Sequence, residues 1–259
     1  GAVSAQSSVT LYGLADAYIG SERLGIKASG ATAGTNGVTQ TVVNSGGQNG
    51  GQNGGQNGSR WGIRVSEDLG GGLAAIAQFE SGFNIDTGSQ SKTNPAGVTK
   101  TDPLFGRQAF VGLKSGFGTV ALGRQYGPYE DMKVVLSLQG HNGFDATGNG
   151  DIGAWQGYAV RVDNSVKFQS NNYSGLSFSA IYGMGEDKTV ATSASSTFGI
   201  GAMYANGPIT VGIVHQNDGR ARSATNGKNE TENTLFAGAY DFGYAKLGGG
   251  YNEARVRQN

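Results

Sequence analysis

The residues that could carry out covalent or metal chemistry are few, and their spacing forms no catalytic or metal-binding motif. The 259-residue chain has no cysteine and two histidines, His141 and His215, so a metal centre built from these side chains is not expected. Neither histidine lies near a serine in a nucleophile–base arrangement. Asp145, Asn149 and Asp151 are rich in oxygen and could bind a cation, but such clusters are usually turns. We therefore expect no enzymatic activity and no cofactor.

Charged side chains at alternate positions indicate an electrostatic role, in which one face of a strand presents fixed charges. The segment 60–65 alternates Arg60, Gly62 and Arg64 with three apolar residues, which is the two-residue period of a β-strand with unlike faces. A face of this kind acts through its electrostatic field on ions and dipoles, without making or breaking bonds.

The strands that must position these residues follow from hydrophobic alternation along the chain. Leu176, Phe178, Ala180 and Tyr182 share one face, and the segment 209–213 repeats the pattern. No run of 18 apolar residues occurs, so no transmembrane helix is expected. The 19 basic and 19 acidic residues balance, so no nucleic-acid partner is expected. The alternation predicts eleven strands, near residues 8–19, 59–67, 73–84, 105–114, 118–126, 159–170, 175–184, 197–206, 209–217, 232–242 and 244–252, and no helix.

The connections between the predicted strands alternate strictly between short and long. The short ones lie near residues 68–72, 115–117, 171–174, 206–208 and 243, and the long ones at 20–58, 85–104, 127–158, 185–196 and 218–231. This asymmetry is typical of a transmembrane barrel with short periplasmic turns and long external loops. Phe117, Tyr173, Phe242 and Tyr244 lie beside short turns and suit an interfacial girdle, with ordinary strand aromatics as the alternative. A threefold Gly-Gly-Gln-Asn repeat over 46–57 predicts a surface loop.

Several strand segments resemble the Gram-negative general porin family. They include Val9-Thr10-Leu11-Tyr12-Gly13, Ser59-Arg60-Trp61-Gly62-Ile63-Arg64, Phe105-Gly106-Arg107-Gln108-Ala109-Phe110, Gly118-Thr119-Val120-Ala121-Leu122-Gly123-Arg124, and Arg161-Val162-Asp163-Asn164-Ser165-Val166. The resemblance covers nearly the whole chain. It implies an all-β, antiparallel, sixteen-stranded up-and-down transmembrane barrel in the bacterial outer membrane. It also implies a homotrimer whose third external loop folds into the pore.

The resemblance assigns site residues within this chain. The constriction loop is 127–158, whose acidic residues would face a basic wall. Arg60, Arg107 and Arg161 would form that wall at one height, with Arg64 nearer the periplasm. A charge facing lipid at mid-depth costs about 2–4 kcal/mol, which also directs the face of Arg60 and Arg64 inward. Arg124 shares the face of Val120 and Leu122 and is expected at the subunit interface. The loop carboxylates are expected to be Glu130, Asp131, Asp145 and Asp151.

The chain departs from the family pattern in two places. Leu14 stands where some members carry a basic residue, which weakens the positive side. The chain ends at Arg257-Gln258-Asn259 without a terminal aromatic strand. Eleven antiparallel strands cannot close a barrel, and open edges leave backbone groups unpaired in lipid, so we expect an N-terminal fragment. Residues 1–5 resemble a signal-peptide remnant, with an arbitrary small-residue tail as the alternative, and residues 6–259 form the barrel domain.

The function predicted from these features is passive diffusion of ions and small hydrophilic solutes, weakly charge-selective with a slight preference for anions. The expected partners are identical subunits, outer-membrane lipid and lipopolysaccharide, and the permeating solutes. A sugar-specific porin would need an aromatic track along the pore, and inward aromatics are sparse. A soluble β-sandwich or an adhesin would not keep the loop asymmetry, and a barrel enzyme would need a nucleophile–base pair.

Overall fold

Eleven strands form one continuous antiparallel sheet in which sequence neighbours are also spatial neighbours. The computed structural model describes residues 7–23, 39–45, 58–90, 103–136, 158–186, 188, 194–219 and 229–258. The strands of the sheet are, in order, β1 (Ser7–Leu14), β4 (Arg60–Gly70), β5 (Leu73–Gly82), β6 (Gln108–Ser115), β7 (Gly118–Tyr126), β8 (Arg161–Ser170), β9 (Leu176–Gly183), β10 (Thr197–Asn206), β11 (Ile209–Gly219), β12 (Asn229–Asp241) and β13 (Lys246–Gln258). The predicted meander is confirmed.

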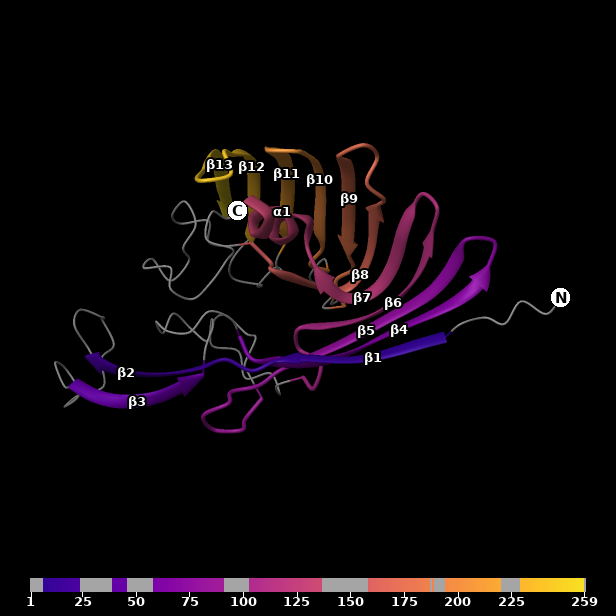
Figure 1. Cartoon of the computed structure of the whole chain (residues 1–259). Helices are drawn as coiled ribbons and strands as arrows, with labels where there is room; N and C mark the ends of the chain where they lie inside the picture. The colour runs from indigo at the N-terminus through magenta and orange to yellow at the C-terminus, as the bar shows by residue number, and fades with distance from the viewer. Residues whose placement is uncertain are drawn as a thin grey trace.

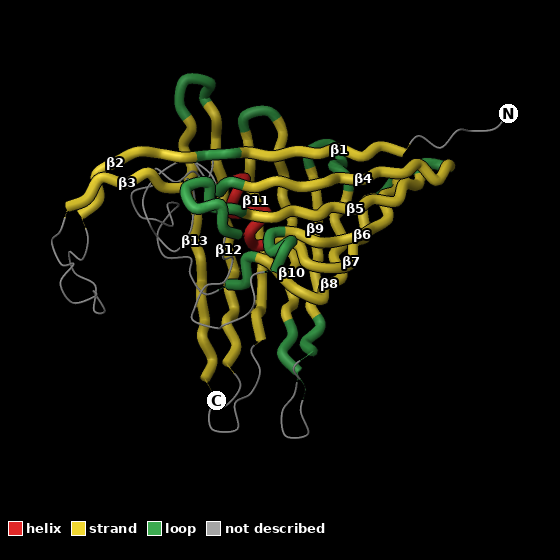
Figure 2. The backbone as a smooth tube through the Cα atoms, turned by 90° about the horizontal axis from the view of Figure 1, so that it is seen from below, coloured by secondary structure: helices red, strands yellow, loops and turns green. Residues whose placement is uncertain are grey.

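The sheet is strongly curved and twisted. Figure 1 shows that it bends from β1 through the middle strands to β13 and leaves a concave side. In Figure 2 the first strands run nearly at right angles to the last ones. Short turns join β4 to β5, β6 to β7, β10 to β11 and β12 to β13. The turn between β4 and β5 uses Gly70, Gly71 and Gly72, all with positive φ, where other residues would be strained.

Register assigns one face of every strand in the sheet. Residues directly opposite each other on paired strands share a face. One ladder crosses all eleven strands, through Ser8, Ser66, Ile76, Gly112, Ala121, Lys167, Ile181, Gly199, Gln216, Asn233 and Ala254. Helix α1 (Pro128–Leu136) lies on the concave side in Figure 1 and contacts β9 to β12. Lys167 of this ladder bonds to α1, so the ladder marks the concave face.

The opposite, convex face carries most of the exposed apolar side chains. A neighbouring ladder contains Val9, Val65, Ala77, Val111, Leu122, Val166, Tyr182 and Phe198. Leu176, Phe178, Ile209, Val211 and Ile213 are also exposed, while Val214 is buried toward α1. The predicted outward direction of the apolar residues in 176–182 and 209–213 is confirmed. Phe117, Tyr173, Phe242 and Tyr244, beside the short turns, are all exposed.

The first predicted strand, 8–19, is corrected to two strands. The main sheet keeps β1, and β2 (Ala17–Arg23) pairs with β3 (Thr39–Ser45) in a separate two-stranded sheet. The break falls at Asp16 because both of its backbone groups bond to Ser59. The Asp16 N–H donates to the Ser59 hydroxyl at 2.9 Å, and this hydroxyl donates to the Asp16 carbonyl at 3.1 Å. A side chain thereby replaces the ladder partner. Strand β3 lies within the predicted loop 20–58, and the Gly-Gly-Gln-Asn repeat lies outside the described residues.

The absence of helix predicted from periodicity is wrong for residues 128–136. Pro128 occupies the first position, where its missing N–H costs nothing, and Glu130 and Asp131 lie in the first turn, where the helix dipole favours negative charge. Tyr129 and Met132 pack on Val214, Leu235 and Ala237 of β11 and β12. The Tyr129 hydroxyl also donates to the Asn252 side-chain oxygen of β13 at 2.9 Å. No helix within the described part of the chain is long and apolar enough to cross a membrane.

Candidate functional site

A buried carboxylate organises the first cluster of polar residues on the concave face. Glu80 of β5 is almost fully buried and accepts a hydrogen bond from Arg107 Nε at 2.6 Å and from the Tyr12 hydroxyl at 2.8 Å. Gln78 Nε2 donates to the same Tyr12 hydroxyl at 2.9 Å. Glu80 lies four residues from Ile76 and Tyr12 four from Ser8, so both belong to the concave face. The cluster therefore holds the Arg107 guanidinium toward the side of the sheet that carries α1.

Tyr126 joins Arg107 to a second arginine. Its hydroxyl accepts hydrogen bonds from Arg107 Nη2 at 3.1 Å and Arg161 Nη2 at 2.8 Å, and Arg161 lies over its ring at 4.7 Å. The register between β7 and β8 shifts between Gly123 and Gln125, opposite Asn164, which has φ of 50°. Such a bulge re-aims the side chains that follow it. The irregularity thus brings the ends of β7 and β8 into the geometry in which Tyr126 meets both guanidinium groups.

Arg64 and Arg60 lie on the concave face of β4. Arg64 stacks on the Tyr12 ring at 4.2 Å, and its Nε donates to Gln78 Oε1 at 3.4 Å. Arg60 Nη1 donates to the Gly58 carbonyl at 3.1 Å. Between them Gly62 must lack a side chain, because an added Cβ would lie 2.6 Å from the Tyr12 hydroxyl. The structure thus places all four arginines predicted for the basic wall, Arg60, Arg64, Arg107 and Arg161, in β4 or at the starts of β6 and β8.

The two described loop carboxylates are both engaged near the base of α1. Asp131 forms an ion pair with Lys167 of β8, whose ammonium group also donates to the Tyr126 carbonyl at 2.9 Å. Glu130 is buried and accepts a hydrogen bond from the Tyr158 hydroxyl. Burial and the neighbouring Glu130 raise the pKa of Tyr158 well above its usual range, so this phenol stays protonated and remains a donor. The predicted Asp145 and Asp151 lie outside the described residues.

Arg124 belongs to the opposite face of the sheet. In the strand ladder Arg124 lies opposite Ala109, and Ala109 lies opposite Phe79, which is on the convex side. Its Nη1 forms an ion pair with Asp163, and its Nε donates to the Gly106 carbonyl at 2.8 Å. The charge of Arg124 is therefore matched within the chain itself.

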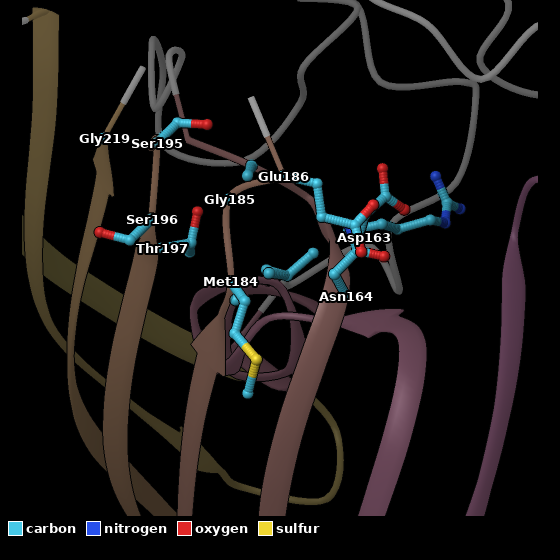
Figure 3. A pocket seen from close by; sticks show the side chains of 13 residues that line it. Asp163, Asn164, Met184, Gly185, Glu186, Ser195, Ser196, Thr197 and Gly219 are labelled. Atoms are coloured by element: carbon cyan, nitrogen blue, oxygen red, sulfur yellow. The ribbon is translucent and has the colours of Figure 1, made fainter. Parts of the chain in front are cut away.

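A pocket of about 410 Å³ opens where β8, β9 and β10 end. Figure 3 shows Asp163 and Asn164 on one side and Ser196, Thr197 and Gly219 on the other. Arg161 also lines it and thus borders both Tyr126 and this pocket. No group of three or more His, Cys, Asp or Glu side chains in the described residues could hold a metal ion.

Sequence reasoning missed four residues that organise the site: Tyr12, Glu80, Tyr126 and Lys167. A signal existed for two of them. Glu80 alternates with apolar Phe79 and faces Gly62 across the ladder, and Gly62 was already placed on the arginine face. Tyr12 pairs with Gly62 in the same way. Tyr126 and Lys167 gave no such signal, because the bulge and the packing of α1 set their partners.

The fold and the site together define a class of protein. A continuous antiparallel meander with an exposed apolar convex face, and arginines with a packed helix on the concave face, is the architecture of outer-membrane β-barrel proteins. The whole chain, residues 1–259, matches the model of the Gram-negative porin family, and the chain belongs to that family. Membership confirms the predicted porin class, its all-β fold and its outer-membrane location.

Individual relatives agree with this assignment. The chain is 32% identical over 260 residues to an outer membrane porin of Bordetella pertussis, an alignment that covers 95% of this chain and 64% of the relative. It is 30% identical over 275 residues to outer membrane porin protein 32 of Delftia acidovorans, which covers 100% of this chain and 67% of the relative. The chain therefore spans about two thirds of the length of these relatives.

Solved structures support the fold. The anion-selective porin from Comamonas acidovorans superimposes with a TM-score of 0.72 at 22% identity, over 98% of this chain and 70% of that one. The OmpF porin of Salmonella typhi superimposes with a TM-score of 0.58 at 18% identity, over 95% of this chain and 66% of that one. At these identities the likeness concerns the backbone architecture alone.

Proposed function

We propose that the protein is a passive diffusion channel for ions and small hydrophilic solutes, and that the concave face of the sheet lines its water-filled pore. The observation that carries this proposal is the convergence of Arg107 and Arg161 on the Tyr126 hydroxyl, on the side of the sheet occupied by α1. Fixed guanidinium groups along a polar wall favour ions and dipolar solutes over apolar ones. No covalent step is required.

We infer a weak preference for anions from the pairing of the charges. Arg107 is neutralised by Glu80, and Asp131 and Lys167 neutralise each other. Arg60, Arg64 and Arg161 are bonded to neutral groups, namely a backbone carbonyl, a glutamine side chain and a tyrosine hydroxyl. Glu130 and Asp218 lie on the same side of the sheet and also accept hydrogen bonds from neutral groups. Against these two carboxylates the three guanidinium groups leave a small positive excess. The proposed constriction is formed by Arg60, Arg64, Arg107 and Arg161 opposite the 127–158 loop, with Glu130, Asp131, Asp145 and Asp151 on that loop.

We further propose that the protein assembles as a homotrimer in outer-membrane lipid and lipopolysaccharide. The convex face of the early strands is apolar, with Val9 71% and Leu11 73% exposed, and needs a cover of protein or lipid. The Arg124–Asp163 pair lies on this side, and we assign it to the subunit interface because a charge pair is costly against lipid.

Planar-bilayer recording tests the proposed function. Addition of the purified full-length protein should produce discrete, long-lived conductance steps in KCl, and proteoliposomes should admit small sugars while excluding large ones. A protein that inserts into the bilayer as folded β-sheet without conducting would contradict the proposal.

A further inference from the structure

A polar clasp from β11 grips the neck of the segment that carries α1. The neck, defined as Gly127 with residues 158–160, is where the chain leaves β7 and returns to β8. Its two sides are joined by the Gly127 N–H, which donates to the Val160 carbonyl at 3.2 Å. Three strands farther along the sheet, β11 presents Gln216 and Asp218, both buried on the concave face.

The clasp holds the returning side of the neck by both of its backbone groups. The Ala159 N–H donates to Asp218 Oδ2 at 2.7 Å, and Gln216 Nε2 donates to the Ala159 carbonyl at 2.9 Å. Gln216 Nε2 also lies 3.2 and 3.1 Å from the two Asp218 oxygens, so the amide orients the carboxylate. A buried carboxylate bonded to N–H donors makes stronger hydrogen bonds than a neutral acceptor does.

The outgoing side of the neck fits against the same glutamine. A Cβ added to Gly127 would lie 2.5 Å from Gln216 Oε1, and Gln216 is fully buried. A side chain at position 127 would therefore displace the amide. Gly127 is not among the glycines with positive φ, so an alanine there conflicts with Gln216 and not with a left-handed backbone.

We propose that Gln216 and Asp218 are positioning residues that fix the neck, and with it α1, across the concave face from β8 to β11. They act through the neck and do not themselves contact a permeating solute. Because the neck leads directly into α1, a loosened clasp allows the helix to shift over Val214 and Leu235 and changes the free cross-section of the pore. Only this last consequence rests on the proposed channel function.

Hydrogen exchange measured by mass spectrometry on the purified protein in detergent tests the clasp directly. Asp218→Ala should raise exchange of the Ala159 amide by about tenfold or more, the amount expected for loss of a hydrogen bond to a charged acceptor. Asp218→Asn keeps an acceptor oxygen of the same shape and should restore most of the protection. Asn217→Ala, on the same strand but bonded to Glu232 on the other face, should leave exchange at Ala159 unchanged.

A double-mutant cycle separates the clasp from general destabilisation. Gly127→Ala and Gln216→Ala should each increase open-channel noise in bilayer recordings and exchange in 158–160. Truncated Gln216 no longer meets the added methyl group, so the double variant should be no worse than Gln216→Ala alone. The inference would be overturned if the Ala159 amide of the Asp218→Ala variant exchanged at the wild-type rate. Fully additive effects in the cycle would also overturn it. A wild-type protein with a protected Ala159 amide that conducts no ions would instead refute the channel function and leave the clasp standing.

Discussion

The concave face has two regions built on the same strand alternation but with opposite chemistry. Over β4 to β8 the inward side chains include arginines held by Glu80, Tyr12 and Tyr126. Over β11 and β12 the inward side chains include Val214 and Leu235, which are buried beneath α1. The inward positions of β11 and β12 that meet Tyr129 and Met132 of α1 are apolar, whereas the inward Gln216 and Asp218 meet the backbone of Ala159 and are polar. The direction of a side chain alone therefore does not determine its polarity.

The arginine region should be the more sensitive to loss of its buried carboxylate. Glu80→Ala leaves Arg107 without its counter-charge in a mostly buried position, and breaking such a pair costs about 3–5 kcal/mol. We expect the free energy of unfolding, measured by urea titration in detergent, to fall by about this much. Glu67→Ala, an exposed glutamate on β4, is the control and should change it little. Equal effects for the two variants would remove the distinction between a buried organising carboxylate and a surface one.

The helix-covered region should respond to loss of volume. Leu235 is fully buried against α1, and Leu235→Ala should lower the free energy of unfolding by about 2–5 kcal/mol through lost contacts and a residual cavity. Phe236→Ala, on the same strand and 57% exposed on the convex face, should cost much less in detergent. The same urea titration measures both variants, and a larger loss from Phe236→Ala would mean that α1 contributes little packing energy.

Removal of one hydroxyl should loosen the arginine region without changing any charge. Tyr126→Phe deletes the acceptor shared by Arg107 and Arg161 but keeps the ring on which Arg161 lies. We expect a loss of about 1–3 kcal/mol in unfolding free energy and a measurable change in single-channel conductance, since both guanidinium groups become freer to move. Tyr182→Phe, exposed on the convex face, provides the control. Unchanged conductance in Tyr126→Phe would place the two arginines away from the permeation path.

Arg124 should have the smallest effect on permeation, because it lies on the convex side and is paired with Asp163. Arg124→Ala should leave the reversal potential within error of the wild type. It should lower the temperature at which trimers dissociate in heat-modifiability gels. A shift in selectivity without any effect on assembly would mean that Arg124 belongs to the pore wall.

The architecture could be predicted from the sequence more completely than the side-chain contacts. Strand positions and the outward direction of the apolar residues in 176–182 and 209–213 followed from alternation, because burial in one direction repeats every second residue. The helix was missed because nine residues give too short a periodic pattern, although Pro128 with Glu130 and Asp131 was a usable start signal.

Other features depended on tertiary structure. The break at Asp16 arises from the distant hydroxyl of Ser59, and the meeting of Arg161 with Tyr126 depends on the bulge between β7 and β8. The adjacent apolar residues Ile213 and Val214 put apolar side chains on both faces of β11. This pattern, together with the inward Leu235, could have predicted an element that covers the inward face.

The reversal potential across a KCl gradient tests the central claim most directly, in the variant with Arg60, Arg107 and Arg161 all replaced by alanine. One charge about 4 Å from an ion in water contributes about 1 kcal/mol, or about fivefold in local anion concentration. The potential should therefore move clearly toward cation preference, with Arg161→Ala alone giving a larger shift than Arg107→Ala, whose charge Glu80 already offsets. Conductance should stay equal or rise because the pore widens. An unchanged reversal potential in the triple variant would contradict the assignment of these arginines to the pore.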